Sequence, residues 1–356
     1  MSRMWFMSLC ASLVLAGSAL AVDSALPVFR IASSEYPSWA TLFAANYAKL
    51  IQQGSGAAGE LEQKYGVDVV VEWMDYDSCI GKFASGAVDA VAITNFDVLP
   101  VAVGRSSVAF LATSTSFGAD MIIGDKKYTN LASLVGVPIH GLEYSVAQYN
   151  VERNIEVAGL DPTKFKFVNM DPGAAAQQLQ TGQLKGVGAI WEPYVTQTLS
   201  KAGSRVYSIA SSRAIPDEIV DMFVAGTDAI DKPGGVEGVR CITDTYYAVN
   251  RMLSDPATAE KIRKAIAAKF ADLTDGQVQD MLTRCKFYGT PEAGLPIFAE
   301  AHMAPIIVRQ TDFHAKYDRF PEGRRPVVGY GSTTEVPRSN LRFDPTWMKE
   351  FATDSK

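Results

Sequence analysis

Acidic and aromatic side chains follow several short apolar segments of this sequence, in a pattern that can bind a small nitrogen-rich molecule. Carboxylates accept hydrogen bonds from the N–H groups of guanidinium or urea, and aromatic faces attract cations. The loops hold almost no Arg or Lys, so the pattern favours a small cation or a donor-rich neutral molecule over an anion. The candidate acids are Glu35, Asp97, Glu143 and Glu192, with Asp75, Asp77 and Asp221 in second rank. The aromatic residues are Tyr36, Trp39, Tyr76, Phe96, Tyr144 and Trp191.

Two stretches about a hundred residues apart share one pattern, and they predict two similar lobes. In each stretch a predicted helix stops at a glycine, Gly86 or Gly182, and a short apolar run typical of a buried parallel strand follows. The first strand leads into residues 94–97 and the second into residues 191–193. Ligands of open α/β sheets bind beyond the carboxyl ends of the strands. We therefore expect a cleft between the lobes, with these loops facing it.

Each candidate residue also has a purely structural interpretation. The alternatives are core packing for Trp39 and Trp191, first-turn helix carboxylates for Glu35 and Glu143, a helix cap for Asp97, and a turn for Glu192 with Pro193.

The elements around the two stretches alternate between strands and helices. Apolar runs predict strands at 28–33, 67–73, 109–113, 136–140, 165–169 and 206–209. Predicted helices occupy 39–52, 78–85, 99–110, 146–158 and 173–180, and three more fill 256–270, 275–287 and 291–303. From Phe320 onward Pro, Gly, Arg and Ser become frequent, which favours an extended tail along the surface.

Length and charge narrow the class of protein. At 356 residues and 47% hydrophobic, the chain is long enough for about two domains. A net charge of −6, without a basic stripe, gives no footprint for nucleic acid or an anionic membrane surface. Residues 1–21 have the basic start, apolar stretch and small-residue cleavage site of a signal peptide, which predicts export.

The cysteines and histidines do not predict a metal site. Three cysteines follow the predicted signal peptide, and the three histidines are not spaced with them as zinc ligands are. Cys241 and Cys285 could pair and leave Cys79 free, or all three could be buried thiols. We expect neither a metal nor a cofactor.

Enzyme motifs are also missing from the sequence. The GxGxxG of residues 54–59 follows a predicted helix instead of a strand, so it predicts a flexible loop and not a dinucleotide site. No GxSxG, P-loop or HExxH is present. A Cys79 nucleophile would need a base, and every histidine is remote from it in sequence.

The order of these features resembles the periplasmic solute-binding proteins of ABC importers, of the nitrate/sulfonate/taurine type. The resemblance covers about residues 28–300. Within the family, the chain resembles most the members that are associated with the utilisation of urea or guanidine. The resemblance to the family rests on the signal peptide, Ser34 to Trp39, the two repeated units, Gly118-Ala119-Asp120 and Gly159-Leu160. It implies an α/β fold of type II-like form, with two lobes, two hinge crossovers and a cleft. The implied parts are a signal peptide at 1–21, a first lobe at 22–116 and 216–305, and a second lobe at 117–215. The expected tail at 306–356, wrapping the surface, departs from the compact ending of the family.

The resemblance implies a function without catalysis. A periplasmic monomer would capture a guanidine- or urea-like solute, close over it by hinge motion, and deliver it to an ABC permease. The alternatives are a binder of a sulfonate, taurine or nitrate, a ligand sensor that docks on a membrane receptor, and a secreted enzyme of the same fold. The predicted ligand-binding residues are Glu35, Trp39, Tyr76, Thr94, Asn95, Asp97, Phe117, Glu143, Tyr144, Ser145, Trp191 and Glu192.

Overall fold

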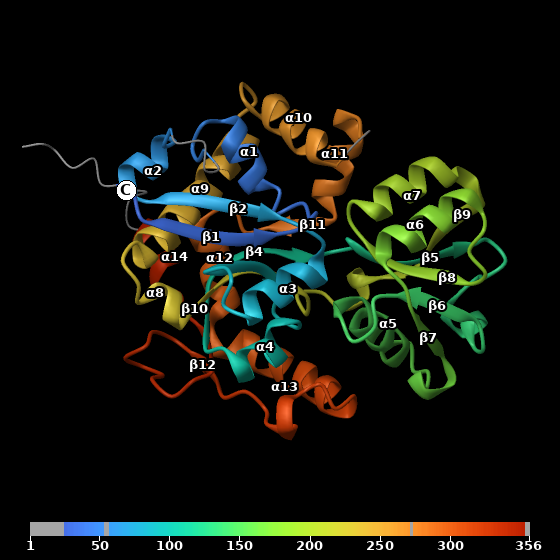
Figure 1. Cartoon of the computed structure of the whole chain (residues 1–356). Coiled ribbons are helices and arrows are strands. Elements are labelled where there is room, and N and C mark those ends of the chain that lie inside the picture. Colours follow the sequence, from blue (N-terminus) through green and yellow to red (C-terminus); the bar gives the residue numbers. More distant parts are fainter. Residues whose placement is uncertain (1–24, 53–56, 271–272, 353–356) are drawn as a thin grey trace, which may run out of the picture.

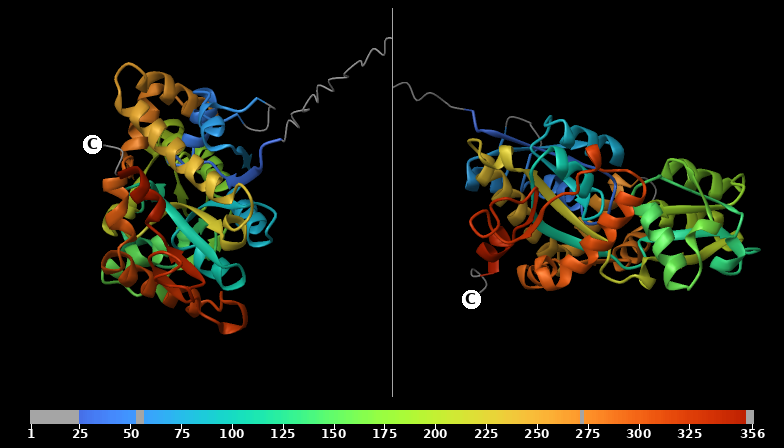
Figure 2. Two further views of the ribbon diagram at one scale, coloured as in Figure 1. Left: turned by 90° about the vertical axis from the view of Figure 1, so that its left-hand side faces the viewer. Right: turned by 90° about the horizontal axis from the view of Figure 1, so that it is seen from below.

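A computed structural model describes residues 25–52, 57–270 and 273–352 of the chain. The predicted signal peptide lies outside these ranges. The described residues form two lobes, each built on its own β-sheet, and the second lobe lies at one end of the molecule (Figures 1 and 2). We define the first lobe by the larger sheet with its helices, and the second lobe by the smaller sheet with α5, α6 and α7.

The larger sheet mixes parallel and antiparallel strands. Among the described residues its order is β12-β13-β4-β10-β3-β1-β2, and β11 pairs with β4. β1 is parallel to β2 and β3, whereas β10 runs antiparallel between β3 and β4. The strands are β1 (Val28–Ser33), β2 (Asp68–Trp73), β3 (Ala90–Thr94), β4 (Ser107–Ser116), β10 (Val220–Gly226), β11 (Cys285–Phe287), β12 (Val328–Tyr330) and β13 (Leu341–Phe343).

Helices cover both faces of this sheet. α1, α9 and α10 pack together on one face, and α3 and α4 lie on the other (Figure 1). The helices of the first lobe are α1 (Thr41–Tyr47), α2 (Glu60–Tyr65), α3 (Tyr76–Ala84), α4 (Val98–Gly104), α8 (Thr227–Ile230), α9 (Gly235–Ser254), α10 (Ala259–Lys269), α11 (Asp275–Thr283), α12 (Pro291–Gly294), α13 (Glu300–Lys316) and α14 (Thr346–Ala352).

The smaller sheet has the order β7-β6-β8-β5-β9, and its core has two layers. Met121 and Ile123 of β5 pack under α6 and α7, while Ile122 packs under α5, because successive side chains of a strand point to opposite faces. The elements are β5 (Asp120–Asp125), β6 (Pro138–Gly141), α5 (Val146–Val157), β7 (Lys166–Asn169), α6 (Pro172–Thr181), β8 (Val187–Trp191), α7 (Tyr194–Ala202) and β9 (Val206–Ser211). Short 3-10 helices lie at Leu131–Leu134, Pro162–Lys164, Gly203–Arg205, Ser212–Ala214, Leu295–Phe298 and Pro321–Gly323.

The glycine stops and helix caps explain why both repeated units end as they do. Gly86 and Gly182 take φ values of 75° and 74°, the left-handed conformation that glycine adopts at low cost. Asp75 caps α3 by accepting a hydrogen bond from Ser78 N, and Ser145 caps α5 by accepting one from Ala147 N. The strands β3 and β8 that follow the glycines are buried along their whole length.

The chain crosses between the lobes at residues 116–120 and again at residues 211–220. The two crossovers contact each other, because the Ser116 and Ser212 hydroxyls lie 2.7 Å apart and Gly118 N donates to Ser212 Oγ. Gly118 has a φ of 102°, and a Cβ there would lie 2.7 Å from Arg213 Nε. This position therefore favours glycine on both conformational and steric grounds.

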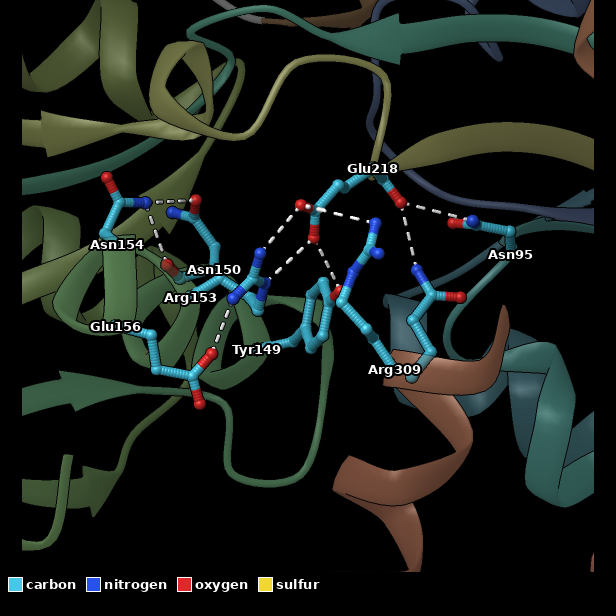
Figure 3. A network of polar contacts seen from close by, with 9 residues as sticks. Asn95, Tyr149, Asn150, Arg153, Asn154, Glu156, Glu218 and Arg309 are labelled. Atoms are coloured by element: carbon cyan, nitrogen blue, oxygen red, sulfur yellow. Dashed lines mark hydrogen bonds and ion pairs between the residues drawn. The ribbon is translucent and has the colours of Figure 1, made fainter. Parts of the chain in front are cut away.

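Helix α13 forms a third connection between the lobes (Figure 3). Glu218, in the returning crossover, accepts hydrogen bonds from Tyr149 and Arg153 of α5 and lies 3.6 Å from Arg309 of α13. Gln310 of α13 also donates to the Glu218 carbonyl. The first-lobe helix is thus tied to the second lobe through one buried carboxylate.

The C-terminal region differs from the extended surface tail expected for residues 306–356. α13 continues to Lys316, and β13 inserts into the larger sheet parallel to β4. Leu341 and Phe343 are fully buried there. Three residues are enough to form a strand between β12 and β4. The segment is too short to be recognised by its hydrophobic pattern, and Pro and Gly are frequent around it. The helix expected at 291–303 is also divided, into α12, a 3-10 turn and the start of α13.

The three cysteines of the described chain are free and buried, so Cys241 and Cys285 do not pair. Cys285 Sγ instead lies 3.6 Å from the Tyr36 hydroxyl. No group of three or more potential metal ligands occurs among the described residues. None of the helices in the described part of the chain is long and apolar enough to cross a membrane.

Candidate functional site

A small cavity lies where the two lobes meet, and we call it the inner cavity. Its volume is about 20 Å³, enough for about one water molecule. Both sheets and both crossovers contribute to it. The lining residues are Tyr36, Trp39, Tyr76, Thr94, Asp120, Val146, Trp191, Ile219 and Asp221.

Four aromatic rings form most of the cavity wall. Trp39 stacks on Tyr76 with ring centroids 5.6 Å apart, and its other neighbour is Tyr36 at 4.9 Å. Trp191, from β8 of the second lobe, meets Tyr76 edge-on at 5.8 Å. Since all four rings are buried, closure of the lobes makes an aromatic box around the cavity.

Two carboxylates complete the box, one from each sheet. Asp120 is the first residue of β5, which runs antiparallel to β8 and places Asp120 opposite Trp191. Asp221 is the second residue of β10, which runs antiparallel to β3 and places it opposite Thr94. The side chains are only 3% and 1% exposed. Each acid therefore lies within the first two residues of a strand that follows a crossover.

Burial governs the electrostatics of these two acids. Ser114 Oγ donates to Asp221 at 2.6 Å, and Ser116 Oγ accepts from Asp120 N at 3.1 Å. Loss of solvation raises the pKa of Asp120 to about 6 and the pKa of Asp221 well above its usual range. Burial and the Asp221 charge also raise the pKa of Tyr36.

Asp97 stands behind the box instead of lining it. Its carboxylate accepts hydrogen bonds from the Tyr76 hydroxyl at 2.9 Å and from Thr94 Oγ1 at 2.8 Å. Burial raises the pKa of Asp97 to about 7. It begins α4 without a side-chain cap hydrogen bond, so its role here is to fix two side chains that do line the cavity.

A second, outer cavity adjoins the first and shares Tyr76 and Trp191 with it. It has a volume of about 230 Å³. Among the residues that the structure describes, no lysine or arginine lines either cavity. The outer cavity is lined by Ser34, Glu35, Asp75, Tyr76, Asp77, Leu142, Asn169, Asp171, Pro172, Trp191 and Tyr194.

The predicted residue Glu192 makes an ion pair between the lobes. It is fully buried, accepts hydrogen bonds from Thr196 N and Oγ1, and pairs with Arg284 at 2.8 Å. Asn95 is likewise structural, because its side chain bonds to the backbone of Glu218 and Val220. Neither residue lines either of the two cavities.

Four other predicted residues lie away from the inner cavity. Glu143 and Tyr144 line a pocket under α5, beside Tyr317. Ser145 caps α5, and Phe117 is 37% exposed beneath the Arg213 guanidinium. Of the predicted set, the structure brings Trp39, Tyr76, Thr94 and Trp191 together at the inner cavity and Glu35 to the outer one.

Sequence reasoning missed Asp120 and gave Asp221 only second rank. In a parallel sheet, ligand-binding residues are expected at the carboxyl ends of the strands. An antiparallel strand presents its amino end at that same edge, so the first residues of β5 and β10 also face the cleft. The available signal was an acid directly preceding an apolar run at each lobe crossing.

Comparisons with known proteins bear on the fold. No family model and no curated protein matches the sequence. The alkanesulfonate-binding protein SsuA of Xanthomonas axonopodis pv. citri, bound to MOPS, superposes with a TM-score of 0.65 at 16% identity, over 83% of this chain and 95% of that one. The aliphatic sulphonate binding protein SsuA of Escherichia coli gives 0.65 at 16%, over 83% and 88%.

A third structure is the periplasmic nitrate-binding protein NrtA of Synechocystis PCC 6803, with a TM-score of 0.55 at 10% identity over 93% of this chain and 99% of that one. At such low identity these similarities establish the architecture alone. The expected two-lobed α/β fold is confirmed.

Proposed function

We propose that this chain, whose fold is that of periplasmic binding proteins, is the solute-binding component of an ABC-type importer. It acts as a periplasmic monomer, captures a guanidine- or urea-like solute in the inner cavity and delivers it to a membrane permease. The observation that carries the ligand class is the pair Asp120 and Asp221, one from each lobe, inside an aromatic box.

The chemistry of the box matches a planar N–H donor. A carboxylate from each sheet can accept hydrogen bonds from the ligand N–H groups, and the aromatic rings that line the cavity can attract a cation. An anion would face two carboxyl groups with no lysine or arginine on the described lining. A cation or a neutral amide avoids this desolvation cost.

Ligand entry and the bound ligand itself both require the lobes to lie further apart than in this structure, because the inner cavity has room for only about one water molecule and guanidine or urea is larger. The contacts that would break join the first lobe to α7 and to the residue before its cap, namely Gln197 with Phe270, Ser200 with Gln277, and Glu192 with Arg284. We place the hinge at the two crossovers, where few residues need to change conformation.

Binding of a small anion is the second candidate function. The similar structures named above are sulfonate- and nitrate-binding proteins. Trp39 Nε1 is buried and has no partner among the described residues, and a protonated Asp221 would also be a donor. Such donors could hold a sulfonate or nitrate if both acids were neutral.

A thermal-shift panel separates the two candidates. Guanidinium, acetamidinium and urea are compared with taurine, methanesulfonate and nitrate at equal ionic strength. A ligand at 100 times its Kd stabilises the native state by about 2.7 kcal/mol, which raises Tm by several degrees. We expect the nitrogen-rich compounds alone to raise Tm. A rise with only sulfonates or nitrate would reject the proposed ligand class.

Substitutions then locate the binder. Asp120→Asn and Asp221→Asn should each weaken guanidinium binding more than tenfold in calorimetry, the loss of about 1.5–3 kcal/mol expected for a charged hydrogen bond. Glu143→Gln serves as the matched control, because Glu143 lies in the pocket under α5. Equal affinity in all four proteins would remove the inner cavity as the site.

A further inference from the structure

The inner cavity places two acids together without a balancing positive side chain. Asp120 and Asp221 both interact with the neutral Tyr36 hydroxyl. Ser114 Oγ donates a hydrogen bond to Asp221, and Ser116 Oγ accepts one from Asp120 N. Neither carboxyl is exposed by more than 3%. Water therefore cannot supply the solvation that two negative charges need.

The nearest ion pair, Glu192 with Arg284, has no net charge. Glu192 contributes to the electrostatics of Asp120, but its own charge is matched by Arg284 at 2.8 Å. Asp97 faces Tyr76 and Thr94 behind the cavity wall and adds no positive charge. The titratable groups that interact with the two acids from the packed elements are Tyr36, Glu192, Tyr246, Cys285 and Tyr288. Tyr76 lines the same cavity, and Arg284 reaches it only through Glu192.

We propose that Asp120 and Asp221 share about one proton in the ligand-free protein, and that a cationic ligand displaces it. On binding, a carboxyl O–H bond breaks, the proton passes to the buffer, and the ligand N–H groups take its place. The cavity then holds two carboxylates and one cation, so its net charge is unchanged. This inference rests on the proposed function, and it narrows the ligand class to small monocations.

Proton displacement gives the site a way to discriminate ligand charge. A cation that releases one proton gains about tenfold in affinity for each pH unit, up to the pKa of the displaced proton. A neutral amide such as urea leaves the proton in place, so its affinity does not follow this slope. Burial raises the pKa of Asp120 to about 6 and the pKa of Asp221 well above its usual range, so the cavity can retain a proton that an exposed carboxyl would release.

Calorimetry with guanidinium chloride as the probe tests the inference. Binding is measured at pH 7 in phosphate and in Tris, whose ionisation enthalpies differ widely. The dependence of the apparent enthalpy on buffer should correspond to about one proton released per guanidinium bound. Asp221→Asn should still bind, more weakly, and release close to none. Glu35→Gln, which alters an acid of the outer cavity, should still release about one.

The outcomes separate this inference from the function on which it rests. Guanidinium binding by the wild-type protein without proton release overturns the inference and leaves the binding function standing. No guanidinium binding under any buffer overturns both. If Asp221→Asn does not fold, Asp120→Asn is compared with the wild-type protein instead. The slope of log Kd against pH for the wild-type protein also shows whether guanidinium binding releases a proton. A slope of zero between pH 6 and 8 rejects the inference.

Discussion

Single side chains at the lobe boundary serve two different purposes, and the acids show the difference most clearly. Asp120 and Asp221 have no cationic partner and line the cavity, whereas Glu192 is paired with Arg284 and lines neither cavity. A buried acid with a cationic partner stabilises the fold. A buried acid without such a partner lowers the stability of the fold, because its loss of solvation is not compensated. The unpaired acids are therefore the better functional candidates.

The pH dependence of stability follows from Asp120. Its pKa rises from 3.8 to about 6 on folding because of burial, so the folded state holds a proton that the unfolded state releases. The stability that this proton gives is complete below about pH 4 and is lost as pH rises through about 6. Two pKa units correspond to roughly 3 kcal/mol.

Urea unfolding at several pH values tests this expectation. Between about pH 4 and 7 the wild-type protein should lose roughly 3 kcal/mol more unfolding free energy than Asp120→Asn, whose amide does not titrate. Glu35→Gln, on the outer cavity, is the control and should follow the wild-type curve. Parallel curves for wild type and Asp120→Asn would show that the carboxyl is solvated.

Among the elements, α5 and α13 hold the lobes together at the Glu218 network (Figure 3). Replacing Glu218 by Ala leaves Arg153 without its main partner and removes the hydrogen bond from Tyr149. We expect faster amide hydrogen exchange in α5 and the C-terminal half of α13, by about tenfold or more. Arg325→Ala is the control, because the Arg325–Asp312 pair is exposed at both ends. Equal exchange rates in both variants would contradict the role of Glu218.

The sequence pattern predicted elements well where they were long or had a cap. It predicted them poorly where a segment forms a strand only because it pairs with a distant one. Gly86 and Gly182 carry a local signal, since only a left-handed turn needs glycine there, and the strands after them were found. Leu341 to Phe343 carry none, because three residues become a strand only when β4 lies beside them. The same limit applies to Asp120 and Asp221, whose positions depend on antiparallel pairing between segments distant in sequence.

At the scale of the whole molecule, the Glu192–Arg284 pair joins the two lobes opposite α13. Glu192→Ala would leave a half-buried guanidinium unpaired, which costs about 3 kcal/mol. We expect that loss in urea unfolding. The double variant Glu192→Gln with Arg284→Met should recover much of it, since neither charge remains. A loss below about 1 kcal/mol in Glu192→Ala would mean that water already solvates the pair.

The position of strand β13 affects how the protein folds during its synthesis. The strand lies between β12 and β4. Residues 107–109 of β4 therefore pair with residues 341–343, which come more than two hundred positions later in the chain. Translation has to pass residue 343 before the larger sheet possesses all its strands. Long-range pairing of this kind slows folding. The newly made chain therefore lacks part of its larger sheet until synthesis is nearly finished.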